Sequence, residues 1–225
     1  MKDNGRIRMY KTIFQEGVDE IEIKKSRFIG YVKPVFSEDE AQEFIEKVRK
    51  QHPTARHHCS AFVLGEKGLV QRYDDDKEPS GTAGVPMLDV LKKEELTNLC
   101  AVVVRYFGGT LLGTGGLVRA YTKATQLALE KALIVEMAPY RKVSIAFDYG
   151  ILGSIEYFIH QHDIPMEDVS YLSSISCTLY LSLENAKGFL PFYQEITSGQ
   201  GNFLQDEEIL LPERNGKLIK EAISC

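Results

Sequence analysis

The stretch that decides the fold is LCAVVVRYFGGTLLGTGGLVRAYTKATQLALEK, residues 99–131. Its first part, residues 99–107, is a continuous run of apolar and β-branched residues, which is typical of a strand buried on both faces. Five glycines follow within residues 108–116. Beyond them, apolar residues recur with helical spacing at Leu117, Ala120, Tyr121, Ala124, Leu127 and Ala128. The stretch therefore predicts a central strand, a glycine-rich loop and a long amphipathic helix.

Upstream of this stretch, the pattern predicts a β-hairpin, a helix, two strands and a second helix. Ser37 is placed to cap the first helix, and Glu40 three residues later completes a capping box. The hairpin turn is expected at Lys25 and Ser26, between two segments that suit strands. The predicted strands cover residues 18–25, 27–36, 57–65 and 68–73, and the predicted helices cover residues 37–51 and 85–93.

The last third of the chain has a different order of elements. From Arg141 the pattern predicts strand, helix, strand, strand, helix and strand, which is the βαββαβ order of ferredoxin-like domains. The boundary between the two domains is expected near residues 137–141, where Pro139 stiffens the junction. We therefore predict an α+β protein with two domains, residues 1–138 and residues 139–225.

Composition and charge narrow the class of protein. The chain is 44% hydrophobic and 26% charged, as in globular proteins, and no apolar run reaches the ~18 residues of a membrane span. We expect a cytoplasmic monomer without contact to membranes. The net charge of −5 is uneven: residues 1–139 hold 21 basic and 20 acidic residues, and residues 140–225 hold 6 and 12. The acidic second half is unsuited to binding nucleic acid by charge, but it offers a surface for a protein partner.

The glycine-rich loop is the main candidate for a ligand site. A helix start exposes unpaired backbone amides that attract anions, and glycines let a ligand approach closely. The spacing fits neither a Walker loop nor GxGxxG, so tight turns and helix packing remain the structural alternative. Cations near the loop favour an anion site, and two of them should oppose the dipole of the following helix. The predicted site comprises Arg105, Gly108, Gly109, Gly113, Gly115, Gly116, Arg119 and Lys123.

Two further segments are secondary candidates. In EPSGTAGVP, residues 78–86, a turn with Ser80, Gly81 and Thr82 precedes a helix, so it suits either an anion or simple helix capping. Lys25 and Arg27 lie at the basic hairpin tip, where they contact phosphates or are merely solvated.

Other polar groups are not expected to carry chemistry. The acidic run of residues 74–78 lacks the ligand pattern of a calcium loop, and we expect a solvated loop there. His57 and Cys59 share one strand face, but no closed ligand set or oriented base accompanies them. The four cysteines form no CxxC pair. We therefore expect no metal, no cofactor and no catalytic residue.

Four segments together carry a resemblance to a known family: KKSRFIG, HHCSAF, DDDKEPSGTAGVPML and VVVRYFGGTLLGTGGLVRAYTKA. They resemble the Impact family, in particular its bacterial two-domain members, along essentially the whole chain. Lys77 stands where many relatives carry a glycine. The resemblance implies an amino-terminal domain folded like the second domain of a small-subunit ribosomal protein. It implies a ferredoxin-like carboxy-terminal domain similar to the last domain of a translocation factor.

The resemblance also implies a link to translation, because eukaryotic relatives compete for the activator of a stress kinase that senses uncharged tRNA. The first hypothesis is a nonenzymatic regulator that binds RNA or ribosomal components through the glycine-rich loop. One alternative is an enzyme acting on a small phosphorylated ligand, by analogy with kinases of the same superfold, although no carboxylate in the sequence stands out as its general base. Another is a protein-protein adaptor that uses the acidic carboxy-terminal domain.

Overall fold

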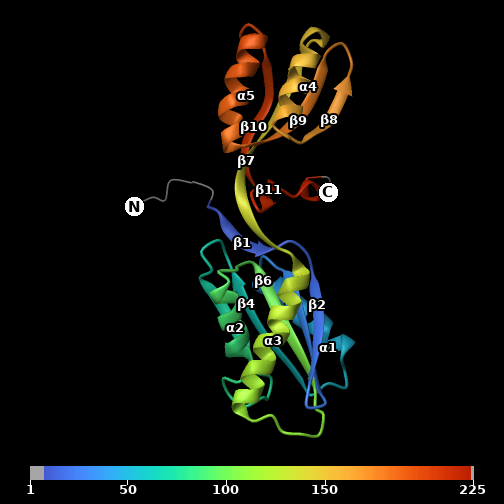
Figure 1. Cartoon of the computed structure of the whole chain (residues 1–225), viewed down its shortest axis with the longest axis vertical. Coiled ribbons are helices and arrows are strands. Elements are labelled where there is room, and N and C mark those ends of the chain that lie inside the picture. Colours follow the sequence, from blue (N-terminus) through green and yellow to red (C-terminus); the bar gives the residue numbers. More distant parts are fainter. Residues whose placement is uncertain (1–7, 224–225) are drawn as a thin grey trace, which may run out of the picture. The chain divides into compact units, whose positions relative to one another are not determined.

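The apolar run of residues 99–106 forms β6 (Leu99–Tyr106), the middle strand of a five-stranded antiparallel sheet. The computed structural model describes residues 8–223 (Figure 1). The strand order is β2-β3-β6-β4-β5. β6 pairs with β3 (Ser26–Pro34) on one side and with β4 (His57–Leu64) on the other, and the edge strands are β2 (Gly17–Ile23) and β5 (Val70–Asp74).

Helices cover both faces of this sheet, which is why β6 reads as a continuous apolar run. On one face lies α1 (Glu38–Gln51), whose buried stripe packs on Cys100, Val102 and Val104. On the other face lie α2 (Gly84–Lys93) and α3 (Thr114–Ala132), which pack on a core that includes Ala101 and Val103. Successive residues of β6 thus serve two separate cores. Ser37 caps α1 as predicted, because its hydroxyl accepts the Glu40 amide hydrogen at 3.1 Å.

The β2–β3 hairpin turns one residue earlier than predicted. Lys24 and Lys25 both have positive φ, at 48° and 65°, and Ile23 pairs with Ser26. Two left-handed residues between paired strands make a turn of the I′ kind, whose twist suits a hairpin. The hairpin packs closely against α3: a Cβ added at Gly30 would lie 2.3 Å from the carbonyl oxygen of Ala124. Gly30 is therefore needed for helix-on-sheet contact.

The second unit comprises residues 137–225, whereas residues 10–136 form the first. Its sheet order β10-β7-β9-β8 and its βαββαβ chain order confirm the ferredoxin-like prediction. β11 (Lys217–Leu218) adds to the β10 edge, and β1 (Tyr10–Ile13) also pairs with β7. The main elements are β7 (Ile134–Phe147), α4 (Leu152–Gln161), β8 (Met166–Tyr171), β9 (Ile175–Ser182), α5 (Leu183–Ile196) and β10 (Asn202–Arg214). The two-domain α+β class predicted from the sequence is thereby confirmed.

The predicted junction at residues 137–141 differs from an open linker. Strand β7 runs through it without a break, and both Ala138 and Tyr140 are buried. Pro139 is accommodated within the strand although it has no N–H to donate. In residues 8–223, no helix combines the length and apolar character needed to cross a bilayer.

Candidate functional site

A cavity of about 450 Å³ lies between the glycine-rich loop and the loop that follows β5. Its polar lining comes from four segments of the first unit: Arg56, His57, Lys77, Glu78, Arg105 and Thr114. Its apolar lining consists mainly of Pro79, Phe107, Leu111, Leu112 and Leu117. The start of α3 and the end of β6 thus meet at one site, as the sequence predicted for Arg105 and the loop.

Sheet register explains why Arg105 reaches this cavity. Arg105 pairs with Phe28 on one side and with His57 on the other. Because side chains alternate along a strand, Arg105 shares the face of Val103, which α2 and α3 cover. The guanidinium is only 5% exposed, so it requires a counter-charge within the protein.

Glu78 supplies that counter-charge. Arg105 Nη1 donates to Glu78 Oε1 at 2.6 Å, and the Tyr121 hydroxyl donates to the same oxygen at 2.9 Å. Glu78 is itself only 8% exposed. Burial raises the pKa of Tyr121, with Cys59 and Glu78 adding to the effect, so its hydroxyl stays protonated as a donor. The three side chains form a buried hydrogen-bonded network.

Part of the guanidinium lacks a partner. Arg105 Nε is buried and makes no hydrogen bond in the part of the chain that the structure describes. The guanidinium lies between two aromatic rings, 5.4 Å from the centroid of Phe28 and 5.7 Å from that of Phe107. These rings stabilise the cation from its faces but accept no conventional hydrogen bond. Arg105 therefore keeps unused donor capacity beside the cavity.

His57 lies beside the same network. Its Nδ1 lies 2.9 Å from the carbonyl oxygen of Asp76, and a carbonyl only accepts, so this nitrogen carries a hydrogen. Its Nε2 lies 3.9 Å from Glu78 Oε1. Neighbouring Cys59 is fully buried, and burial raises the pKa of its thiol, which donates to the Asp75 carbonyl oxygen at 3.1 Å. A thiol in that state is not a nucleophile.

The prediction of a solvated acidic loop at residues 74–78 is wrong. The carboxylate of Asp75 accepts the amide hydrogens of Gly81, Ala83 and Gly84 at 2.8 to 3.0 Å. Asp76 accepts the amide hydrogen of His58 at 2.7 Å. The loop is thus tied to β4 and to the start of α2, and Glu78 is buried. Between residues 8 and 223, no group of three or more His, Cys, Asp or Glu is arranged to hold a metal ion.

The same contacts correct the reading of Ser80, Gly81 and Thr82. The turn does bind an anion, but that anion is the carboxylate of Asp75, and it occupies the Gly81 amide. The Thr82 hydroxyl donates to the Pro79 carbonyl oxygen at 2.6 Å and caps no helix. Helix α2 is capped from a distance by Asp75, because its own N-cap residue is an alanine. Ser80 is exposed and does not line the cavity.

The five glycines of the loop play different roles. Gly108 serves packing, since an added Cβ would lie 2.0 Å from the backbone carbon of Lys25. Gly109 and Gly113 have positive φ, at 85° and 71°, and open space around them. Gly115 and Gly116 lie inside the first turn of α3. Close packing therefore explains why residue 108 is a glycine, and the positive φ of the loop explains Gly109 and Gly113.

The cations of the predicted site separate into two groups. Arg119 and Lys123 are exposed, and neither forms an ion pair with any residue that the structure describes. Their backbones lie beyond the first turn of α3, which begins at Thr114, but Arg119 Nη1 lies 3.8 Å from the position that a Cβ on Gly115 would take, so its charge stays near the start of the helix. Lys25 lies on the hairpin turn against Gly108. Arg27 instead donates to Glu20 at 2.8 Å and occupies the sheet face opposite Arg105.

The sequence alone does not indicate that five further residues line this cavity: Arg56, His57, Lys77, Glu78 and Phe107. Nor does it indicate that Tyr121 contacts Glu78, although a tyrosine in an apolar stripe needs a partner for its hydroxyl. Lys77 has φ of 69°, which explains why a glycine suits this position. Pairing Tyr121 with Glu78 needs the fold, because 43 residues separate them.

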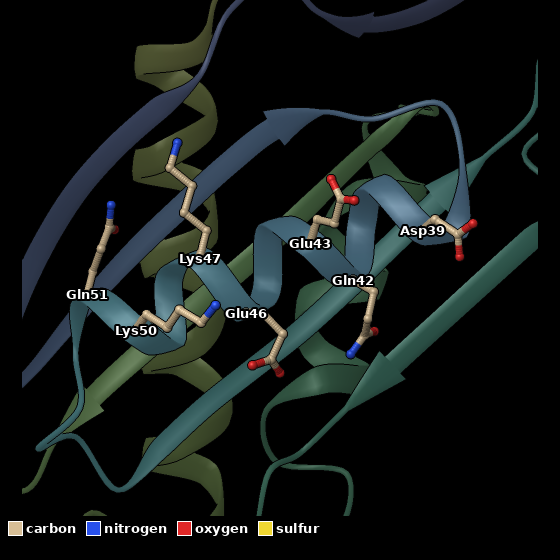
Figure 2. Close-up of a pocket in the computed structure, with 7 residues that line it drawn as sticks. All are labelled: Asp39, Gln42, Glu43, Glu46, Lys47, Lys50 and Gln51. Carbon is tan, nitrogen blue, oxygen red and sulfur yellow. The ribbon is translucent and has the colours of Figure 1, made fainter.

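A larger hollow of about 800 Å³ lies over the outer face of α1. Figure 2 shows its seven lining side chains, all from that single helix, with acidic and basic groups interspersed. One convex helix cannot surround a ligand, and Lys47 there approaches Glu16 at 3.8 Å. We regard this hollow as a solvated helix face and the smaller cavity beside Arg105 as the candidate site.

Comparisons with known proteins agree with this architecture. Residues 24–129 match the Impact N-terminal domain, and residues 145–200 match a domain of unknown function, DUF1949. The chain is 41% identical to "IMPACT family member YvyE" of Bacillus subtilis, over 96% of this chain and 99% of the relative. It is 37% identical to "IMPACT family member YigZ" of Escherichia coli, over 83% and 93%. A crystal structure of a hypothetical protein, 32% identical, superposes with a TM-score of 0.55 over 90% and 99% of the two chains.

Proposed function

The chain belongs to the Impact family, and from this premise we propose that it is a nonenzymatic, translation-linked regulator. In this proposal it binds RNA, or ribosomal components that carry RNA, through the glycine-rich loop and its surroundings. The observation that carries the proposal is the set of exposed cations without ion pairs beside that loop.

These cations come from two elements. Arg119 and Lys123 lie one helical turn apart on the exposed side of α3, and Lys25 lies on the hairpin turn that packs against Gly108. On the same helix, Lys131 approaches Asp19 at 3.8 Å. Unpaired cations are free to neutralise phosphates, whereas a paired cation must first give up its partner. The part of α3 near the glycine-rich loop is therefore better suited to a polyanion than the end of the helix at Lys131.

Apolar groups on the loop suit single-stranded RNA. Phe107 is 44% exposed, and Leu111 on the same loop is also exposed. Exposed aromatic rings next to cations let bases stack while the backbone is neutralised. The acidic carboxy-terminal unit is less suited to RNA, because residues 140–225 contain 6 basic and 12 acidic residues. We propose that it instead presents a surface for a protein partner.

A double variant tests the proposal. Replacing Arg119 and Lys123 by alanine should weaken binding of single-stranded ribosomal RNA fragments and lower the salt slope by about 0.7 for each lost phosphate contact. Folding should be unchanged, because both side chains are exposed.

The matched control is Lys92→Ala with Lys93→Ala. It removes two exposed cations from the end of α2 and leaves the glycine-rich loop intact. RNA affinity should fall much less in this control than in the α3 variant. Equal affinities of the wild type and the α3 variant at every salt concentration would refute the proposal and favour a packing role for the loop.

A further inference from the structure

We infer that the cavity beside Arg105 binds a small phosphomonoester, with its phosphate at the start of α3 and its organic body against the apolar wall. The cations of this site differ from those proposed to bind RNA, although Phe107 and Leu111 belong to both sites, and the inference does not depend on that proposal. It follows from the enclosure, the charge, the unused donors and the apolar lining of the cavity.

The cavity has the size and construction of a small-molecule site. Its volume of about 450 Å³ lies within the range of ~300 to 1,000 Å³ that is usual for ligand pockets. Residues from separate segments enclose it, including Arg56 before β4, Lys77 after β5 and Leu111 of the glycine-rich loop. Such a site holds a ligand on several sides, unlike the hollow over α1.

The charge of the lining suits a dianion. Arg56, Lys77 and Arg105 contribute three positive charges, and Glu78 contributes one negative charge, which leaves two in excess. Arg56 and Lys77 are exposed, and neither forms an ion pair with any residue in the described part of the chain. The contacts of Glu78 Oε1 with Arg105 and Tyr121 offset its repulsion of an anion. A phosphomonoester at neutral pH carries close to two negative charges.

Arg105 provides the independent sign of a ligand. A guanidinium has five N–H donors, and among residues 8–223 only Nη1 has a hydrogen bond to another side chain. Nε is unpartnered although the residue is 95% buried, judged from its 5% exposure. Buried donors normally have a hydrogen-bond partner, and Glu78 accepts a hydrogen bond from one guanidinium nitrogen only. An oxyanion in the cavity, which Arg105 lines, would give the guanidinium the second acceptor that Glu78 does not.

The start of α3 completes the phosphate subsite. Gly113 is the N-cap residue and supplies no side chain to the first amides of the helix. The nearby Thr114 also lines the cavity, and its hydroxyl has no partner in the described part of the chain. Free amides at a helix start, next to a glycine that allows close approach, are suited to phosphate.

The remaining wall selects for an organic body. Phe107, Leu111 and Leu112 also line the cavity, and they gain nothing from inorganic phosphate alone. A ring or short apolar chain attached to the phosphate would cover them and bury apolar surface. The phosphomonoester should therefore bind more tightly than either of its two parts.

Calorimetric titration of the full chain tests this with four probes: adenosine 5′-monophosphate, ribose 5-phosphate, inorganic phosphate and adenosine. We expect the nucleotide to bind most tightly, ribose 5-phosphate and phosphate more weakly, and adenosine most weakly. Arg56→Ala combined with Lys77→Gly should weaken nucleotide binding about 10-fold or more, since two charge-assisted contacts are lost. Both residues are exposed, and glycine suits the positive φ of Lys77, so the fold should persist.

Arg119→Ala with Lys123→Ala is the matched control, because it removes the same charge outside the cavity. It should leave nucleotide affinity unchanged while it weakens RNA binding, so each site can fail alone. Backbone NMR shifts should centre on Thr114 and Leu117. The inference is overturned if no phosphomonoester binds at millimolar concentration, if the two double variants lose nucleotide affinity equally, or if adenosine binds as tightly as its phosphate.

Discussion

The pair of Glu78 and Arg105 joins fold and site at the scale of single residues. Both side chains are more than nine-tenths buried, and removing ions from water is costly unless each has a partner. Their contact at 2.6 Å, with Tyr121 as a further donor, offsets that cost. The network therefore fixes the loop after β5 to the end of β6 and to α3.

Replacing Glu78 by glutamine should destabilise the first unit by about 3 to 5 kcal/mol, because Arg105 would remain buried without a counter-charge. Urea denaturation followed by circular dichroism would measure the change. Arg105→Met should have a comparable cost, since it leaves the Glu78 carboxylate buried without a cation beside it. The two substitutions combined should cost clearly less than their sum, and strict additivity would show that the two side chains are not coupled.

His52 gives a pH-dependent prediction. Its Nε2 lies 2.6 Å from the Tyr31 hydroxyl and its Nδ1 lies 2.9 Å from the Tyr106 hydroxyl. Partial burial, with the neighbouring His58 and Arg27 adding to it, lowers the pKa of His52 below its ordinary value of 6.5. In the native protein the neutral ring is therefore favoured.

The sign of the effect follows from linkage. The unfolded chain binds the proton at higher pH, so stability from the neutral ring is complete above about pH 6.5 and is lost as pH falls through the native pKa. We expect the His52 ring signals to titrate below pH 6.5 by NMR and His52→Gln to flatten the stability loss in that window. A titration midpoint at or above 6.5 would contradict the argument.

At the scale of elements, the glycine-rich loop combines packing and helix initiation. Gly108→Ala should destabilise by about 1 to 3 kcal/mol, because its Cβ would meet the backbone of Lys25 at 2.0 Å. Gly115→Ala should instead stabilise by up to about 1 kcal/mol, since it lies in α3 with φ outside the left-handed region. Melting curves would separate the two. A loss of stability in Gly115→Ala would mean that α3 begins later.

Most elements could be predicted from local patterns, and most of the site could not. The apolar run of β6 and the stripe of α3 are signals that one segment carries by itself. The pairing of Glu78 with Arg105 and Tyr121 depends on register between strands and on how α3 lies over the sheet. The same dependence explains the error for Arg27, whose neighbour Phe28 faces α3 and leaves Arg27 on the other side.

At the scale of the whole molecule, β7 makes the connection between the two units resistant to proteolysis. Residues 137–141 lie within this strand, Tyr140 and Arg141 pair with β9, and Ala138 and Tyr140 are buried, so the stretch should resist cleavage. The acidic loop should resist for the same reason. Thermolysin should first cut next to Leu69 or Leu111, which are 80% and 82% exposed in short loops.

Mass spectrometry of the earliest fragments would identify these sites. Early fragments ending within residues 137–141 would show that β7 opens there in solution. Substituting Leu69 by serine should remove only its own cut and leave cleavage at Leu111, because the two leucines lie in separate loops.

The carboxylate that Asp75 places among the amides of Gly81, Ala83 and Gly84 has a consequence for selectivity. Because it is tethered to the turn it fills, it competes at an effective concentration that dissolved anions do not reach in a cell. The turn before α2 is therefore self-liganded, and its order is independent of the phosphate content of the surroundings. Of the two glycine-containing turns that lead into helices in this unit, only the turn before α3 keeps backbone amides to which a dissolved anion can bind.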